Sequence, residues 1–407
     1  MEEKYINFIL NRCIYPKSNS LFILYYKDNK DFIDKLIKRA STDGYENILT
    51  IEQDIELEHQ LLMELTSDEI INHPYFNNPI WQKAAEEKYV LLNADSNYPN
   101  YFDDIPNSKI LAVNKVKGLV RKRYNERIAE DSISWTIFAL PNSYWAKRLF
   151  PDSDDAYKKL EEMIYSFSMI DNNYSENSFD NYLRIENKKI NYLNNLDIKE
   201  LKLTSDLGTN LTMGLVDNYI FRALEQNHCV ENLPTYSVWS MPHKYQTNGI
   251  VMGSLPITHR RANVVDYWFQ FKDGKVIDYD AKIGKEYLDD YFSKGEDHKR
   301  LGEIAIIDSN SPIAKTNKVY NFNLFDENIS THLALGMAYK NTIKNGTIMS
   351  NEELDKNGCN VCSDHLDFTI GINSLNIVAV TKNNEEVEIY RNGKFNYELI
   401  GEECPFI

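Results

Sequence analysis

The chain has 407 residues, of which 43% are hydrophobic, and this length and composition predict two globular domains with buried cores. Its formal net charge of −16 argues against a nucleic-acid partner, because nucleic-acid binding draws most of its affinity from a basic surface. Neither an apolar run of about 18 residues nor a charged-then-apolar leader is visible, so we expect no membrane span, no secretory signal and a cytoplasmic location.

The first half of the chain alternates short apolar runs with helical stretches. The predicted strands are residues 21–26, 47–50, 89–92 and 135–140, and residues 31–40 form a predicted helix. Short buried strands joined by helical crossovers build a parallel sheet. We therefore predict an α/β N-terminal domain over residues 1–195 with a mostly parallel sheet.

Two functions are disfavoured in this half. A nucleotide site of the dinucleotide-binding type needs a glycine-rich turn after the first strand, and residues 27–30 contain no glycine. The basic run Arg121, Lys122 and Arg123, with Arg127, is expected on a helix as a solvated face. Residues 172–195 are the predicted connector to the second domain, partly helical from Tyr182 to Leu196.

The second half has the alternating pattern of antiparallel strands. Runs at 200–204, 210–213, 267–271 and 276–279 are predicted strands, and Asp273-Gly274 marks a hairpin turn between the last two. Residues 377–380, 385–390 and 394–397 repeat the pattern around Asn392-Gly393. We predict a strand-rich α+β domain over residues 196–407, and we expect it to be the catalytic, metal-binding domain.

Residues that bind divalent metals recur on apolar segments between positions 301 and 371. Glu303 begins a β-branched run that reads as a core strand. His365 and Asp367 are two residues apart in an alternating segment, so as a strand both side chains project from one side of the sheet. His332 and Tyr339 are seven residues apart in a segment without proline, and we expect them on one face of a helix.

This set of side chains suits a hydrolytic metal site. Zinc, cobalt and manganese sites of that type combine His nitrogens with Asp or Glu oxygens, and a carboxylate can bridge two ions about 3.5–4 Å apart. Each His alone is more often a satisfied core or surface residue, and it is the combination that favours a metal site. The sequence therefore predicts one or two divalent ions.

The chain resembles the thermophilic-type metalloaminopeptidase family, the aminopeptidase T-like enzymes. The segments that carry the resemblance, in family order, are residues 135–151 (WTIFALPNSYWAKRLFP), 208–214 (GTNLTMG), 301–307 (LGEIAII), 324–339 (LFDENISTHLALGMAY) and 365–371 (HLDFTIG). The resemblance implies a dinuclear exopeptidase that removes N-terminal amino acids from peptides through metal-activated water. It also implies a homodimer.

The resemblance assigns roles residue by residue. Glu303, His332, His365 and Asp367 match metal ligands, with Glu303 also counted as catalytic, and Tyr339 matches the tyrosine that stabilises the transition state. Glu327 is placed near the site, where it could hold the α-amine of the substrate. An alternative is that Glu327 is an acid at the N-terminus of the predicted His332 helix, stabilising its dipole.

The chain departs from the family at one metal position. The family supplies a further metal-binding Glu from a Pro-Thr-Glu-Glu segment, and the corresponding residues here are Pro234-Thr235-Tyr236-Ser237. We expect Tyr236 near the substrate. The loss of a ligand leaves two other hypotheses open: a divergent member with altered or dedicated chemistry, and a weakened pseudoenzyme that binds peptide-like ligands.

Three other residues are candidates for a replacement ligand or a substrate contact. His243 and His259 have polar, loop-like neighbours, which favours exposed histidines. Glu231 is the nearest carboxylate to Tyr236, but a strand offset of five residues turns it to the opposite face.

Overall fold

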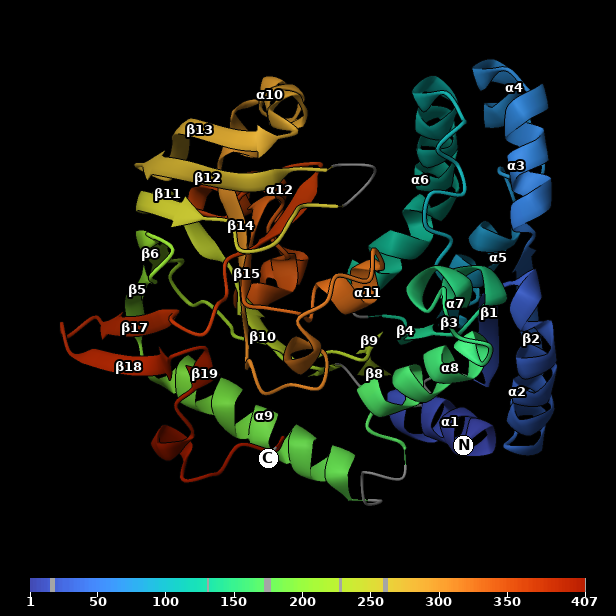
Figure 1. The fold of residues 1–407 in the computed structure, drawn as a ribbon, viewed down its shortest axis with the longest axis horizontal. Helices are drawn as coiled ribbons and strands as arrows, with labels where there is room; N and C mark the ends of the chain where they lie inside the picture. Colours follow the sequence, from blue (N-terminus) through green and yellow to red (C-terminus); the bar gives the residue numbers. More distant parts are fainter. Residues whose placement is uncertain (15–18, 130–131, 172–176, 227–228, 259–262, 407) are drawn as a thin grey trace. The chain divides into compact units, whose positions relative to one another are not determined.

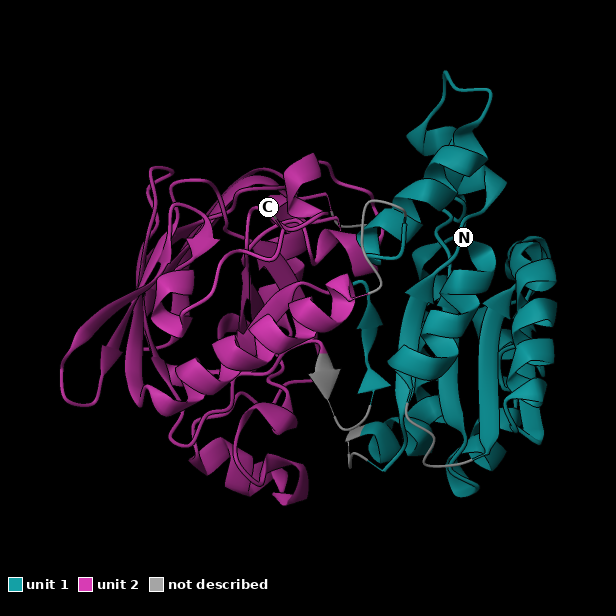
Figure 2. Ribbon diagram, turned by 90° about the horizontal axis from the view of Figure 1, so that it is seen from below, with its two compact units in different colours: residues 1–176, 225–234 teal, residues 177–224, 235–407 magenta. Residues whose placement is uncertain are grey.

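The computed structural model describes residues 1–14, 19–129, 132–171, 177–226, 229–258 and 263–406. The chain divides into two compact units (Figure 2): unit 1 holds Met1–Glu176 and Glu225–Pro234, and unit 2 holds Asn177–Leu224 and Thr235–Ile407. The boundary thus lies near residue 176 rather than at residue 195, and a short segment after Leu224 returns to unit 1. Of the predicted connector, residues 172–176 lie outside the described part of the chain.

Unit 1 is built on a five-stranded parallel sheet in the order β2-β1-β3-β4-β9 (Figure 1). Its strands are β1 (Ser20–Tyr26), β2 (Asn47–Gln53), β3 (Val90–Asp95), β4 (Trp135–Ala139) and β9 (Asn232–Leu233). The first six residues of β1 are all buried, as expected for an apolar strand with neighbours on both sides. The predicted parallel sheet is confirmed.

Helices connect the strands of this sheet and take up most of the rest of unit 1. They are α1 (Glu2–Phe8), α2 (Lys30–Thr42), α3 (Ile55–Glu64), α4 (Ser67–Asn72), α5 (Ile80–Glu86), α6 (Asn107–Ala129), α7 (Ser143–Leu149) and α8 (Ala156–Phe167). Asp54 caps α3, Thr66 forms a capping box with Glu69 on α4, and Asn142 caps α7. The capping side chains accept hydrogen bonds from backbone N–H groups that have no partner within the first helical turn. These caps define where the helices begin.

The basic run on α6 is only in part the solvated face that the sequence predicts. Lys122 and Arg123 are exposed, but Arg121 is only partly exposed, with its guanidinium 4.5 Å from the Trp81 ring centre, and Tyr124 is fully buried. On a helix, positions 121 and 124 are three residues apart and share one face, so one side of the run faces inward.

Unit 2 contains a four-stranded and an eight-stranded sheet. The four-stranded sheet has the order β10-β14-β15-β16, with β10 (Ser237–Ser240), β14 (Leu301–Ile307), β15 (His332–Gly336) and β16 (His365–Thr369). The eight-stranded sheet has the order β13-β12-β11-β6-β5-β17-β18-β19, with β5 (Ile198–Thr204), β6 (Asn210–Leu215), β11 (Pro242–Met252), β12 (Val265–Lys272), β13 (Lys275–Ile283), β17 (Asn376–Thr381), β18 (Glu386–Arg391) and β19 (Lys394–Phe395). Its described helices are α9 (Ser178–Asn195), α10 (Lys285–Ser293), α11 (Asn323–Asp326) and α12 (Asn351–Lys356).

The hairpins predicted in the second half are confirmed. Asp273 and Gly274 both have positive φ, 48° and 77°, at the turn between β12 and β13, which are antiparallel. Asn392 and Gly393 also have positive φ, at the turn between the antiparallel strands β18 and β19. Asn, Asp and Gly adopt positive φ more readily than other residues, which is why these dipeptides identify the turns. A strand-rich second unit with antiparallel sheets follows, as predicted.

The predicted helix from His332 to Tyr339 is wrong, because the first part of this segment is strand β15. β15 pairs with β14 on one side and β16 on the other, so all of its residues are buried in the middle of a sheet. Leu and Ala are good helix formers, but helix propensity amounts to less than about 1 kcal/mol per residue, and strand pairing on both sides overrides it. Gly336 ends the strand at a φ of 97°, where a Cβ atom would lie 2.1 Å from the Asp364 carbonyl oxygen.

The four-stranded sheet has one apolar and one polar face. Ile304, Ile306, Leu333, Leu335 and Phe368 alternate along its strands and join one core with residues of the eight-stranded sheet. Because successive side chains of a strand point to opposite faces, residues 303, 305, 332, 334, 365 and 367 share the other face. No helix among the described residues is long and apolar enough to cross a membrane.

Candidate metal centre

The strand register brings two carboxylates to the same row of the polar face. Glu303 pairs with Ala334, and Ala334 pairs on its other side with Asp367. Directly paired residues of antiparallel strands point to the same face. On β15 itself, the residue between the two carboxylates carries only a methyl group, so side chains from β14 and β16 can approach each other across this strand.

Two histidines point into the same place. His365 Nε2 lies 3.0 Å from Asp367 Oδ1 and 3.3 Å from Glu303 Oε2, and His332 Nε2 lies 3.8 Å from Glu303 Oε1. The structure thus brings together the four residues that the resemblance assigned to metal binding. Glu303 and His332 are buried, and His365 and Asp367 are partly buried.

Backbone carbonyl groups orient both imidazole rings. Nδ1 of His365 lies 2.8 Å from the Met337 carbonyl oxygen, and Nδ1 of His332 lies 3.3 Å from that of Ser330. With Nδ1–H donated to a carbonyl, Nε2 is the ring atom that faces the carboxylates. Metal-binding histidines in proteins are held in this way, which fixes the tautomer and the ring orientation.

The charges of the cluster act on each other strongly. Burial lowers the pKa of His365, but Tyr339, Asp367 and Glu303 raise it by more, and the net pKa lies well above the usual value. Burial raises the pKa of Glu327 well above its usual range, and the nearby carboxylates of Asp367 and Glu303 raise it further. Three carboxyl groups in one place favour a bound cation, because like charges this close cannot all ionise without one.

Glu327 and Tyr339 lie beside the four predicted ligands. Glu327 follows α11 as its C-terminal cap, so it cannot stabilise the N-terminus of a helix, and the alternative of a dipole-stabilising acid is wrong. Tyr339 follows β15 and is 40% exposed, with its ring centre 5.0 Å from that of His365. The hydroxyl end is nevertheless removed from water, and its pKa is raised overall, since the lowering effect of His365 is outweighed by this desolvation and by the carboxylates of Glu303 and Asp367.

Tyr236 and Ser237 point in different directions. The Tyr236 ring packs against Tyr182 and Phe406, with ring centres 5.6 and 5.5 Å away, and is buried. Ser237 pairs with Ile307, which lies on the polar face of the sheet with Glu303. Ser237 is therefore the residue of the pair that β10 turns toward the face that carries the cluster.

Sequence reasoning missed Trp239, which shares this face with Ser237. Trp239 pairs with Ala305, and Ala305 pairs with His332. The alternation of β10 from Ser237 onward is a signal that could have identified it.

The other residues considered from the sequence lie elsewhere. His243 is in β11, packed against Gly358, and burial lowers its pKa. Glu231 belongs to unit 1, where its carbonyl accepts a hydrogen bond from Ile137. His259 lies outside the described residues.

The donor set fits a divalent ion of the zinc, cobalt or manganese type. Two imidazole Nε2 atoms and two carboxylates converge, and Glu303 Oε2 is buried without a hydrogen bond of good geometry. Within the described part of the chain, no three such side chains are already spaced around one point as metal ligands. The carboxylates instead contact the imidazoles directly, so binding an ion requires small side-chain movements.

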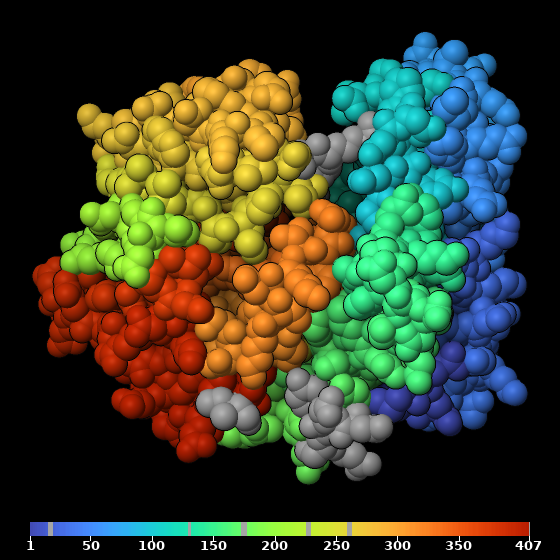
Figure 3. All heavy atoms as spheres, in the orientation of Figure 1, coloured from blue at the N-terminus to red at the C-terminus, as the bar shows by residue number. Residues whose placement is uncertain are grey.

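A cavity of about 190 Å³ adjoins the cluster within unit 2. Glu327, His332 and Asp367 line it, together with Asn321 and Asn323 near α11. The orange segment that includes α11 lies on the surface in Figure 3. The cavity gives the cluster a polar neighbouring space in which part of a substrate can be held.

Comparison with known proteins places the chain in a family. The model of the thermophilic metalloprotease (M29) family matches residues 2–395. The chain is 31% identical to aminopeptidase 2 of Geobacillus stearothermophilus, covering 93% of this chain and 94% of that protein. It is 28% identical to aminopeptidase AmpS of Bacillus subtilis, covering 91% and 92% of the two chains. The chain belongs to the thermophilic metalloprotease family, which confirms the resemblance, and it is a metal-dependent peptidase by that membership.

Solved structures agree in fold. Wild-type AmpT from Thermus thermophilus matches with a TM-score of 0.86 and 24% identity, over 97% of this chain and 99% of that one. The 2,5-dihydroxypyridine dioxygenase from Pseudomonas putida KT2440 matches with a TM-score of 0.53 and 9% identity, over 97% and 96%. At these identities the two matches concern the fold alone.

Proposed function

We propose that the chain is an aminopeptidase that hydrolyses the N-terminal peptide bond of peptides at the cluster of Glu303, His332, His365 and Asp367. The convergence of their donor atoms on one face of the four-stranded sheet carries the proposal. The family and the aminopeptidase relatives support it and favour it over a binding protein.

The proposed roles follow from the positions of the side chains. His332, His365, Glu303 and Asp367 hold the ion, and Glu303 also accepts the proton that the attacking water gives up. When bound, a divalent ion lowers the pKa of water to near neutrality and polarises the scissile carbonyl. Tyr339 keeps its proton and donates a hydrogen bond to the oxygen on which charge develops. Glu327 binds the free α-amine of the substrate, since it lines the adjacent cavity beside Asp367, whereas the third carboxyl group there, Asp326, already accepts hydrogen bonds from backbone N–H groups.

We further propose that the protein holds fewer than two tightly bound ions. The position that supplies a carboxylate in the family carries Ser237 on the inward face, and a hydroxyl group is a weak ligand for zinc, cobalt or manganese compared with a carboxylate. The identity of the ion, the homodimer and the cytoplasmic location stay predictions. Elemental analysis after dialysis and analytical ultracentrifugation test the ion and the homodimer.

The substrate experiment uses matched pairs. The metal-supplemented protein is expected to cleave unblocked aminoacyl amides and short peptides, and to lose this activity when the same peptides are N-acetylated. Acetylation removes the positive charge that Glu327 is proposed to bind. A preparation that cleaves acetylated and free peptides equally, or that cleaves none of a varied panel, contradicts the proposal.

A further inference from the structure

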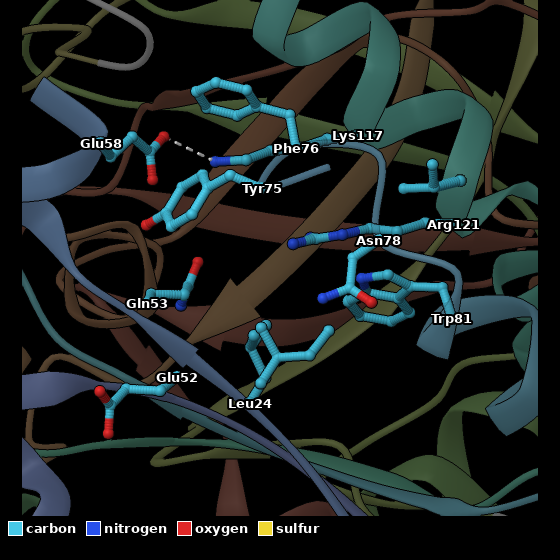
Figure 4. A pocket seen from close by; sticks show the side chains of 12 residues that line it. Leu24, Glu52, Gln53, Glu58, Tyr75, Phe76, Asn78, Trp81, Lys117 and Arg121 are labelled. Carbon is cyan, nitrogen blue, oxygen red and sulfur yellow. Dashed lines mark hydrogen bonds and ion pairs between the residues drawn. The ribbon is translucent and has the colours of Figure 1, made fainter. Parts of the chain in front are cut away.

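Unit 1 contains a second polar cavity that the peptidase chemistry does not use. It measures about 100 Å³, room for several water molecules or a small organic molecule, and it lies at the carboxyl ends of β1 and β2 beside α6 (Figure 4). Leu24, Ile51 and Val120 supply apolar walls. In open α/β sheets, the carboxyl ends of the strands are the edge at which ligands bind.

Arg121 reaches into this cavity with unused hydrogen-bonding groups. Its guanidinium stacks over Trp81 at 4.5 Å, and its Nε atom is buried without a hydrogen bond. Among the described residues, none forms an ion pair with Arg121. Figure 4 shows the end of its side chain directed to the middle of the cavity. A guanidinium held over an aromatic ring is restricted in orientation, and its two parallel N–H groups can bind a planar acceptor such as a carboxylate.

Asn78 adds a second donor. Its Oδ1 accepts the backbone N–H of Ile80 at 3.0 Å, which leaves the amide nitrogen as the group that faces the cavity (Figure 4). Since an amide nitrogen and a guanidinium are donors only, the pair needs a ligand that accepts hydrogen bonds.

The carboxylates nearby do not supply that acceptor. Glu58 Oε1 is 3.1 Å from Lys117 Nζ, so this buried acid and this lysine neutralise each other. Glu52 Oε2 accepts a hydrogen bond from the Tyr25 hydroxyl at 3.0 Å, and the Glu52 carboxylate points away from Arg121 in Figure 4. Asp95 acts on Arg121 electrostatically but forms no ion pair with it, and burial raises the Asp95 pKa to about 6, so this acid is mostly ionised at neutral pH. Arg121 thus has carboxylates in its neighbourhood but, among the described residues, no direct counter-ion on its guanidinium.

We propose that this cavity binds the carboxylate of a small organic acid, with the carboxylate on Arg121 and Asn78 and a short apolar body against Leu24, Ile51 and Val120. Because Glu52 and Glu58 already line the cavity, a monocarboxylate, with one negative charge, is repelled less than dianionic phosphate. The apolar walls favour an acid with an aliphatic chain over an inorganic ion. The site lies within unit 1 and does not depend on the proposed peptidase centre.

The test uses the full-length protein, with butyrate as the probe and the indole N–H resonance of Trp81 as the reporter. The chain has five tryptophans, and the spectrum of the Trp81→Phe variant identifies the Trp81 signal. Butyrate is expected to shift this signal saturably, whereas butyramide and inorganic phosphate are not. A saturable shift by phosphate of equal strength, or no saturable shift by butyrate, overturns the proposal.

Two charge-removing substitutions on α6 distinguish binding in the cavity from binding to the basic surface of the helix. Arg121→Gln is expected to weaken butyrate binding by at least about tenfold, the equivalent of losing one charge-assisted contact. Arg123→Gln removes the same charge two residues away, at an exposed pair with Glu126, and should leave the dissociation constant unchanged. If Arg121→Gln lowers the unfolding temperature, Arg121→Lys provides a folded variant that keeps the charge but loses the forked geometry, and weaker binding is again expected. Equal butyrate affinity in the parent protein and both Arg121 variants places the probe elsewhere and overturns the proposal.

Discussion

At the scale of single residues, Tyr339 has the most specific role to test. Tyr339→Phe removes one hydroxyl and keeps the ring beside His365. If the hydroxyl acts only in the transition state, kcat should fall by about 10²–10³, the cost of losing one oxyanion donor, with little change in KM. Steady-state kinetics on an unblocked dipeptide measure this. Metal content serves as the control, since a variant that also loses its ion reports on binding and not on the hydroxyl.

Ser237 and Tyr236 differ in what a carboxylate would do at each position. Ser237→Glu places an acid on the polar face of the four-stranded sheet, so the content of tightly held metal after dialysis should rise. Tyr236→Glu buries the acid between Tyr182 and Phe406, where an unpaired charge is costly, so it should lower stability and leave metal content unchanged. Elemental analysis and thermal unfolding of both variants measure the difference. Higher metal content in Tyr236→Glu than in Ser237→Glu would falsify the assignment of the inward position.

At the scale of elements, β15 acts as a spacer. Ala334 pairs with Glu303 and with Asp367, so its size sets how closely the two carboxylates approach. Ala334→Val adds two methyl groups at a fully buried position of the polar face, so it should reduce metal affinity and destabilise unit 2 by about 1–3 kcal/mol. Calorimetric titration of the dialysed protein with zinc tests the first part, and chemical denaturation tests the second.

Leu333→Ala is the control on the opposite face of the same strand. Leu333 is fully buried in the core, so its truncation should destabilise unit 2 by about 2–5 kcal/mol while metal affinity is retained in the folded protein. If both variants lose metal affinity equally, the effect of Ala334→Val belongs to general destabilisation of the sheet and not to the spacing of the carboxylates.

Local sequence patterns predict an element correctly where its packing partners in the fold do not override the segment's own helix or strand preference. Buried apolar runs such as residues 21–26 indicated the parallel strands, and Asp273-Gly274 indicated a hairpin through the positive φ that these residues tolerate. The segment that begins at His332 was predicted as a helix because its Leu and Ala residues favour one. It is a strand because it lies between two others, a tertiary effect that one segment does not reveal.

The parts of the candidate site that depend on one strand alone were predictable, whereas those that depend on contacts between segments were not. Alternation in a strand gave the common direction of His365 and Asp367 without any knowledge of the neighbouring strands. Which of Tyr236 and Ser237 faces the cluster depends on the register of β10 against β14, and that register is visible only in the folded sheet. Arg121 could not be separated from its exposed neighbours because its burial depends on Trp81, forty residues earlier in the chain.

At the scale of the whole molecule, the two units should respond differently to metal. The proposed ligands all lie in unit 2, on β14, β15 and β16, whereas the parallel sheet of unit 1 contributes none of them. A ligand that binds the folded state and not the unfolded chain stabilises by about 2.7 kcal/mol at one hundred times its dissociation constant. That stabilisation should reach the strands that hold the ligands.

Hydrogen exchange measures this stabilisation strand by strand. Addition of zinc, cobalt or manganese to the dialysed protein should slow amide exchange in residues 301–307, 332–336 and 365–369, because opening of these strands then requires release of the ion. Exchange in β1 and β3 should stay unchanged, since neither strand carries a proposed ligand, and magnesium serves as a control ion because it prefers all-oxygen ligands. Protection that appears in β1 and β3 as strongly as in β14–β16 would show that the ion binds elsewhere, or that the two units unfold as one.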